Sequence, residues 1–257
     1  MKSLFRFELR KLLRQKSYYV CLGIILLTVV ISVTVLKIMS FSDSEIAEFI
    51  QKLHNGFSEC VNARLNVAFE LVMSFFIAYN ICGDFDQSII KGVYSRGYSR
   101  RQYYLTKLCL VLIATIISFF TLIIFTFILY SIMFGVGKPD SIWLIIRSIL
   151  LQLLYVVTST IMVVMLCFVF KKSGGVIAFC AFVPNIVDVI LSLISSAIFA
   201  FTDKELNLSR FWLVEMSNYA GELEITNTNL LITIFGLIIY GLIFGLMGYY
   251  LCEKTDL

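Results

Sequence analysis

The sequence predicts an all-α integral membrane protein, with six transmembrane helices preceded by an N-terminal amphipathic helix that lies in the membrane interface. The 257 residues are 60% apolar and 15% charged, whereas soluble domains are about 45–50% apolar and about 25% charged. Mean hydropathy is +0.92. Six stretches of the chain reach the roughly 20 apolar residues that cross a hydrocarbon core. We therefore expect a single transmembrane domain over residues 1–257, without a separate soluble domain.

Residues 1–17 predict the interfacial helix. Apolar side chains recur at helical spacing on one face: Phe5, Leu9, Leu12 and Leu13. Cations repeat every four residues on another face: Lys2, Arg6, Arg10 and Arg14. Such a helix lies with its apolar side in the acyl chains and its cations near anionic headgroups. The three arginines are the expected interfacial anchor, with membrane lipid as their partner, and a plain juxtamembrane role is the simpler alternative.

Six spans follow the interfacial helix in order: Tyr18–Ile38, Val61–Cys82, Ser99–Phe134, Ile142–Phe170, Ser173–Phe199 and Leu230–Leu251. The third and fourth exceed the length that a bilayer needs, so we expect them to tilt or to extend beyond it. Lys and Arg are enriched in cytoplasmic segments. With the N-terminus inside, 14 of the 21 basic residues fall in inner segments. Both termini are therefore predicted to be cytoplasmic, and the net charge of +4 indicates topology rather than a nucleic-acid partner.

Five connections join the spans. The two longest outer connections, residues 39–60 and 200–229, are polar and acidic. Two short turns lie at 135–141 outside and 171–175 inside. The segment 83–98 is the one substantial cytoplasmic connection, so we expect any cytoplasmic partner to contact it.

A short helix is predicted within this inner connection. Asp86 can cap it, and its apolar side chains line one face: Ile89, Ile90, Val93 and Tyr94. Because two helical turns are not stable alone in water, this face needs the membrane or a protein groove. Gly97 ends the helix, and Ser99 with Gln102 forms a capping box that starts the next one. A partner-binding helix and a headgroup-binding basic loop both explain these residues.

The sequence lacks the motifs of catalysis and of metal or nucleotide binding. His54 is the single histidine, which removes His-based metal and protease motifs. The seven cysteines lie mostly in apolar runs without a CxxC pair, so we expect buried thiols. There is no GxxxxGK[ST] phosphate-binding loop. We expect no enzymatic activity, no metal and no cofactor in this chain.

Three polar residues inside the predicted spans are candidates for a translocation path: Glu70, Asn185 and Asp188. Charged groups within a bilayer are costly and face protein or a water-filled path. One interpretation is structural, in which Glu70 pairs with Arg64 or Arg147. The other is functional, in which Glu70 and Asp188 form an acidic patch suited to cationic or amphipathic peptides.

Small residues and a proline modify the last two spans. Pro184 permits a kink in the fifth span. Gly241 and Gly245 form a GxxxG pattern in the sixth span, which favours close helix packing within one subunit or between two.

The inner connection carries a motif in a fixed order: an acidic residue at Asp86, a lysine at Lys91, the run Gly97-Tyr98-Ser99-Arg100, and a second lysine at Lys107. This motif and the layout of the full chain resemble the permease subunits of ABC transporters of the type-2 export class. A Gly-Thr pair that is common in that family before the first lysine is Ser88-Ile89 here.

The resemblance implies an assembly and a site. The short inner helix would be the coupling helix that seats in an ATPase subunit, through Asp86, Ile89, Ile90, Lys91, Val93, Tyr94, Gly97, Ser99 and Arg100. The N-terminal helix would be the interfacial elbow, and residues 200–229 would form a partly helical outer element. Two ATPase subunits, which would hold ATP and Mg²⁺, would join this chain and a second copy or a paralogue.

The resemblance also implies a function and a location. The transporter would lie in a bacterial cytoplasmic membrane and would export peptides, as in the bacitracin, lantibiotic and cytolytic-peptide branch of the family. Two alternatives remain open: a membrane sensor or scaffold that binds a cytoplasmic partner without transport, and an exporter of a lipid or a small-molecule antibiotic. An intramembrane enzyme is weakly supported, because Glu70 and Asp188 are the only carboxylates within the predicted spans.

Overall fold

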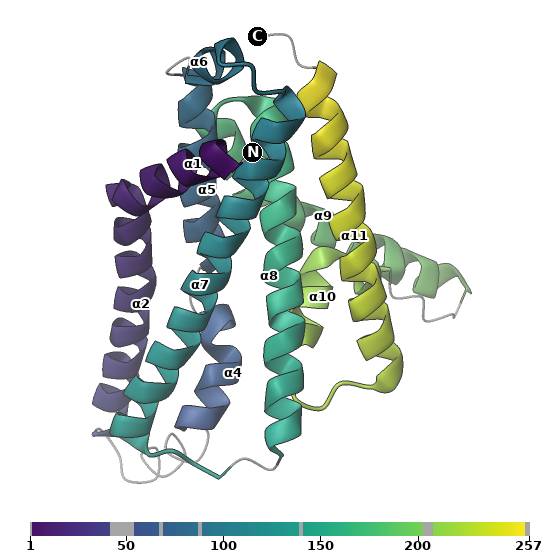
Figure 1. The fold of residues 1–257 in the computed structure, drawn as a ribbon. Helices are drawn as coiled ribbons and strands as arrows, with labels where there is room; N and C mark the ends of the chain where they lie inside the picture. The colour runs from purple at the N-terminus through teal and green to yellow at the C-terminus, as the bar shows by residue number, and fades with distance from the viewer. Residues whose placement is uncertain are drawn as a thin grey trace.

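The computed structural model describes residues 2–41, 54–66, 69–86, 89–138, 141–202 and 208–254. All regular structure within these ranges is helical, which confirms the all-helical class (Figure 1). The elements are α1 (Lys2–Arg14), α2 (Lys16–Ser40), α4 (Gly56–Asn66), α5 (Phe69–Asp86), α6 (Ile89–Ser95), α7 (Arg100–Phe134), α8 (Ile142–Phe170), α9 (Ser173–Thr202), the 3-10 turn η1 (Ser209–Phe211), α10 (Leu213–Gly221) and α11 (Asn227–Lys254).

Five helices in the described part of the chain are long and apolar enough to cross a membrane: α2, α7, α8, α9 and α11. The sixth span depends on α4 and α5, which are inclined to each other by 43° and pass the same test only as a pair. The predicted span Val61–Cys82 therefore corresponds to this bent pair rather than to one straight helix, and a sixth span stays a prediction. The apolar composition of the segment conceals the break, which falls between Arg64 and Glu70. The chain is a membrane-embedded, multi-pass helical protein.

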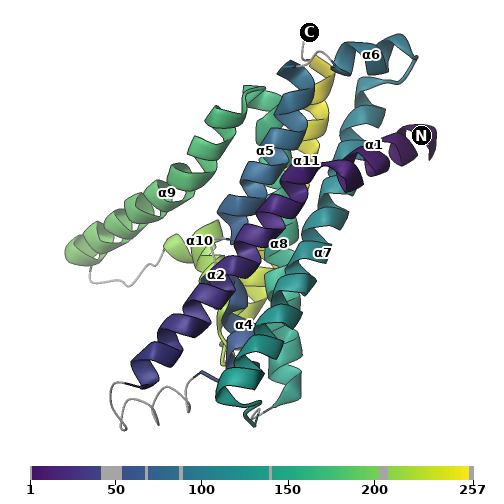
Figure 2. The ribbon, with the colours of Figure 1, turned by 90° about the vertical axis from the view of Figure 1, so that its left-hand side faces the viewer.

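The helices pack around α8, which contacts α5, α7, α10 and α11. Of its most apolar 18-residue stretch 56% is buried, whereas none of the corresponding stretch of α9 is. Figure 2 shows that α9 diverges from the other helices along its length. Outward-facing apolar side chains cover both α9 and α11, as expected of helices that face lipid or another protein within a bilayer.

The helices define two ends of the bundle. The α6 end carries α1, α6 and the C-terminal end of α11, and the α4 end carries the start of α4 and the connection from α7 to α8 (Figure 1). The segments predicted to be cytoplasmic gather at the α6 end. The alternation of the predicted spans therefore agrees with the fold, and the side of the membrane that each end faces stays a prediction.

Helix α1 lies across the bundle at the α6 end, with one face against α7. Its buried residues are Leu4, Glu8 and Leu12, each 7% exposed or less. Leu13, assigned to the apolar face, is 54% exposed instead. The predicted face is rotated because a charged residue, Glu8, occupies the centre of the buried one. The three arginines of the expected anchor, Arg6, Arg10 and Arg14, are exposed.

Local signals place the start of α7 correctly. Gly97 has a φ of +83°, a left-handed conformation that favours glycine, and it separates α6 from α7. The predicted capping box is present: the Gln102 backbone N–H donates to Ser99 Oγ at 3.2 Å, and the Ser99 N–H donates to Gln102 Oε1 at 3.2 Å.

The GxxxG pattern packs within the chain. A methyl carbon at Gly241 or Gly245 would meet side chains of α8, with the nearest atoms at 3.6 Å and 3.7 Å. A closer approach occurs one turn further on at Gly248, where such a carbon would lie 2.9 Å from Cζ of Tyr104. Tyr104 is 1% exposed, so its ring has little room to move.

We expect Gly248→Ala to lower the free energy of unfolding by about 1–3 kcal/mol, because the new methyl group forces a buried ring to shift. Gly245→Ala is the matched control, since its methyl group makes only ordinary contacts and alanine favours the helix. Unfolding in mixed detergent–SDS micelles measures both. Equal stability of the two variants would contradict the close packing of α11 on Tyr104.

Candidate functional site

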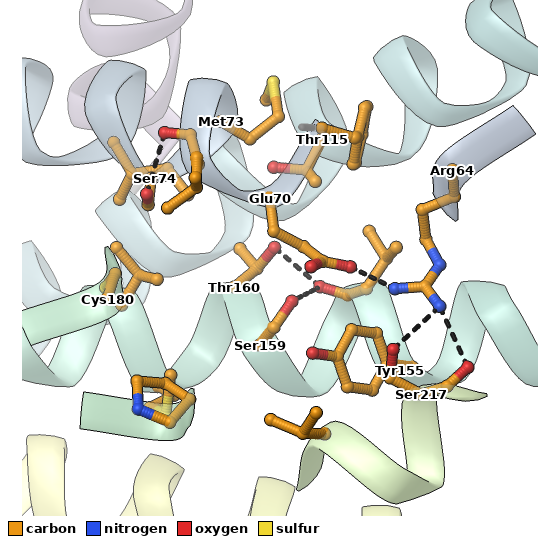
Figure 3. A pocket seen from close by; sticks show the side chains of 18 of the residues that line it. Arg64, Glu70, Met73, Ser74, Thr115, Tyr155, Ser159, Thr160, Cys180 and Ser217 are labelled. Atoms are coloured by element: carbon orange, nitrogen blue, oxygen red, sulfur yellow. Dashed lines mark hydrogen bonds and ion pairs between the residues drawn. The ribbon is translucent and has the colours of Figure 1, made fainter. Parts of the chain in front are cut away.

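A cavity of about 270 Å³ lies between α5, α8 and α9, with α10 on the side nearer the α4 end. Figure 3 shows the polar side chains around it. They come from separate helices: Arg64 from α4, Glu70 from α5, Tyr155 and Thr160 from α8, Asn185 from α9, and Ser217 from α10. This cavity is the candidate functional site, because it combines an apolar wall with convergent polar groups inside a membrane protein.

Arg64 is the organising residue of the cavity. Its side chain is 1% exposed and forms an ion pair with Glu70. The same guanidinium donates to the Ser217 carbonyl oxygen at 3.0 Å and to Ser217 Oγ at 3.1 Å. It also lies 4.5 Å from the ring centroid of Tyr155. A buried guanidinium needs several acceptors to offset its loss of hydration, and here they tie α4 to α5, α8 and α10.

Glu70 is far more accessible than its partner, with 38% of its side chain exposed. Oε1 pairs with Arg64, whereas Oε2 has no partner within the described part of the chain. The ion pair of the structural interpretation is therefore present, with Arg64 as the partner. Arg147, the other candidate, donates to the Leu223 carbonyl oxygen at 2.6 Å.

The structure separates the other two candidates for a translocation path. Asn185 lines the cavity, and its side-chain amide donates to the Ala181 carbonyl of its own helix at 3.1 Å. Asp188 is not among the residues that line the cavity. Glu70 and Asn185 thus line one cavity, and an acidic patch of Glu70 with Asp188 stays a prediction.

Hydrogen bonds from several helices hold α10 over the cavity. Besides the bonds from Arg64, Ser148 Oγ of α8 donates to the Ala220 carbonyl at 2.8 Å. Trp212, which precedes α10, donates from Nε1 to the Pro184 carbonyl of α9 at 2.8 Å. The predicted outer connection 200–229 is thus partly helical in its described residues, as expected.

A second cluster of buried charges lies at the α6 end. Lys107 Nζ is 2.6 Å from Glu8 Oε2 and 2.6 Å from Asp84 Oδ2, and it donates to Asn80 Oδ1 at 3.2 Å. Three acceptors satisfy the three N–H groups of the ammonium. Tyr103 donates to Asp84 Oδ2 at 2.7 Å, and Lys11 also pairs with Asp84. The cluster joins α1, α5 and α7.

Sequence reasoning missed both carboxylates of this cluster. Asp84, rather than Asp86, is the acidic residue that contacts the motif lysine Lys107, and Asp86 is exposed. Glu8 was overlooked, because the helix that carries it is predominantly basic. The available signal was its position midway between Leu4 and Leu12, which places a carboxylate on a buried helical face.

The residues assigned to ATPase coupling divide into two faces of α6 and its flanks. Ile90 and Val93 are buried in the core of this chain, at 1% and 6% exposure. Ile89 and Tyr94 are half-buried against the same core, and burial raises the pKa of the Tyr94 phenol to about 12. The chain itself therefore supplies the groove that the short helix needs.

The exposed members are Asp86, Lys91, Gly97 and Ser99. Arg100 is half-exposed and donates to the Glu253 carbonyl oxygen at 3.1 Å, so it ties the start of α7 to the end of α11. A partner at this end would meet polar side chains rather than the apolar face of α6.

No group of three or more His, Cys, Asp or Glu side chains that could hold a metal ion occurs in the described ranges. His54 instead contacts Glu59, with 2.6 Å between Nδ1 and Oε1.

The fold and the site define a multi-pass helical membrane protein with a mostly apolar cavity between its helices, into which a few polar groups converge. Over residues 29–257 the chain matches the model of the family DUF2705, described as a protein of unknown function, and it belongs to that family. No curated protein and no solved structure matches the chain.

Proposed function

We propose that this chain is the membrane-spanning subunit of an ATP-driven ABC exporter in a bacterial cytoplasmic membrane. Two copies of a separate ATPase subunit would hold ATP and Mg²⁺, and a second copy or a paralogue of this chain would complete the membrane part. The cargo would be an amphipathic antimicrobial or cytolytic peptide. The layout of the spans and the motif of the inner connection support this proposal.

One observation carries it: α5 connects the cavity to the surface helix α6. Glu70 lies near the start of α5 and lines the cavity, and Asp86 ends α5 just before α6. At 1.5 Å per residue the two are about 24 Å apart along the helix axis. Because α6 is packed on the core through Ile90 and Val93, a displacement of α6 would be transmitted to the helix that carries Glu70.

The energy for such a displacement would come from the partner. Ligand-driven motion requires a ligand with different affinities for two states. The sequence contains no phosphate-binding loop of the GxxxxGK[ST] type. ATP binding and hydrolysis on the ATPase subunits would therefore supply the difference and pass it to α5 and α7.

The test is co-purification of the tagged chain with the ATPase encoded beside it. The double variant Lys91→Glu/Arg96→Glu reverses two exposed charges at α6 without touching its buried face. We expect the amount of co-purified ATPase to fall at least about tenfold, because the reversed charges would repel the complementary charges of the partner. Lys172→Glu is the matched control, since it reverses an exposed charge in the α8–α9 turn at the same end of the bundle.

Two outcomes would contradict the proposal. One is a wild-type chain that captures no ATPase, which would favour a membrane sensor or scaffold. The other is an equal loss of ATPase in the double variant and in Lys172→Glu, which would show that general charge at this end, rather than α6, attracts the partner.

The size of the cavity favours a second class of cargo. A volume of about 270 Å³ lies just below the range of about 300–1,000 Å³ that is usual for ligand sites. A small-molecule antibiotic or part of a lipid fits such a volume. Export assays with small molecules and with peptides would separate the two classes.

A further inference from the structure

We propose that the cavity binds an amphipathic monocation, whose charge is held by Glu70 and whose occupancy is transmitted through Arg64 to α10. The inference deepens the proposed function, because it names the ligand class of the candidate site and rests on that site being part of a transport path. Three features of the cavity carry it: the sign of its accessible charge, its volume, and the double role of one guanidinium.

The unequal exposure of the two charged side chains determines the sign of the ligand's charge. Arg64 and Glu70 are the only charged residues among the described residues that line the cavity. The Arg64 side chain is 1% exposed and the Glu70 side chain 38% exposed. An entering molecule therefore meets the carboxylate and not the guanidinium. Oε2 of Glu70 has no partner within the described ranges, so it can accept hydrogen bonds from an ammonium or a guanidinium. An anion would meet this carboxylate at short range and be repelled.

The volume of the cavity and the chemistry of its wall determine the size and polarity of the uncharged part of the ligand. A water molecule takes about 30 Å³ of the liquid, so a cavity of about 270 Å³ replaces on the order of nine waters. That space holds an arylalkyl ammonium or a single cationic side chain of a peptide. The surrounding wall is apolar: Phe69, Met73, Ile77, Val156, Met162 and Val163. The ligand that fits best is one positive group on a short apolar body.

Arg64 makes the site responsive. Its guanidinium binds Glu70 and, through two hydrogen bonds, Ser217 of α10. A cation at Oε2 competes with Arg64 for the negative charge of Glu70 and weakens the ion pair between Glu70 and Arg64. The position of the guanidinium, and with it the bonds to α10, then depends on whether the cavity is filled. Trp212 precedes α10 and is bonded to Pro184 of α9, so its environment changes when α10 shifts.

The experiment uses this tryptophan as a reporter. The sequence has two tryptophans, and Trp143 is 69% exposed on α8, so Trp143→Phe leaves Trp212 as the single reporter. The full chain in mild detergent is titrated with phenethylammonium, with neutral 2-phenylethanol and with anionic 3-phenylpropionate. We expect a saturable change in Trp212 fluorescence with the ammonium alone.

Two further variants locate the binding. Glu70→Gln keeps an acceptor for Arg64 but removes the charge, and we expect it to weaken binding at least tenfold. Glu215→Gln, on α10 and outside the cavity lining, is the matched control with unchanged binding. Ser159→Phe fills the cavity from α8 while all charges stay, and we expect it to abolish the response, which keeps the test decisive if Glu70→Gln fails to fold.

Several outcomes would overturn the inference. A response to the neutral probe equal to that of the ammonium would mean apolar partitioning. A response that survives Ser159→Phe would place the ligand elsewhere. Because the assay contains no ATPase, its failure leaves ATPase capture at α6 standing, and failed capture leaves cation binding standing.

Discussion

Replacing Lys107 with methionine is expected to lower the free energy of unfolding by about 3–5 kcal/mol, the usual cost of removing one partner from a buried ionic cluster. Lys107 Nζ contacts Glu8, Asp84 and Asn80, and both carboxylate side chains are 2% exposed. Lys11 still neutralises Asp84 in the variant. Glu8 is left as a buried, unpaired charge, because its only ion pair in the described part of the chain is with Lys107.

Unfolding in mixed detergent–SDS micelles, followed by circular dichroism, measures this loss. Lys91→Met is the matched control, because Lys91 is exposed on α6, and we expect a change below about 0.5 kcal/mol. Adding Glu8→Gln to Lys107→Met should restore part of the lost stability, since it removes the unpaired charge. A Lys107→Met chain as stable as the wild type would show that the cluster does not hold α1 onto α5 and α7.

The apolar stretches of the sequence predicted most of the helices, because the length and composition of a spanning helix are local properties. Ser99 and Gln102 likewise predicted the start of α7, since a capping box involves only four neighbouring residues. The break between α4 and α5 was missed, because the apolar residues of α5 dominate the average over the predicted span and mask the polar composition of α4. The ion pair of Arg64 with Glu70 spans the break, and composition does not reveal such a contact.

The candidate site was predictable in part. Glu70 was recognised because a carboxylate within a span is rare and costly. Its partner could not be chosen from the sequence, since Arg64 and Arg147 are both near outer helix ends and the contact depends on how α4 meets α5. Ser217 was missed altogether. A serine in a polar connection carries no signal, and it joins the site only because α10 folds back over the cavity.

The second large effect concerns the two partners of the cavity ion pair, which we expect to differ in cost. Glu70→Leu leaves Arg64, 1% exposed, as an unpaired buried charge, and should lower the free energy of unfolding by about 3 kcal/mol or more. Arg64→Leu leaves Glu70, 38% exposed, which water can reach. The remaining cost of Arg64→Leu is the loss of the donors to Ser217, about 1–3 kcal/mol.

The double variant Arg64→Leu/Glu70→Leu makes the comparison decisive. The double variant removes the buried guanidinium together with its partner, so no unpaired buried charge remains, and we expect it to be more stable than Glu70→Leu alone. The same SDS unfolding assay ranks all three against the wild type. If Arg64→Leu proved the more damaging single change and the double variant no better than Glu70→Leu, the bonds from Arg64 to α10, rather than its buried charge, would dominate the energetics of the cavity. The position of α10 would then depend on Ser217 more than on Glu70, and a cation bound at Glu70 would have little effect on α10.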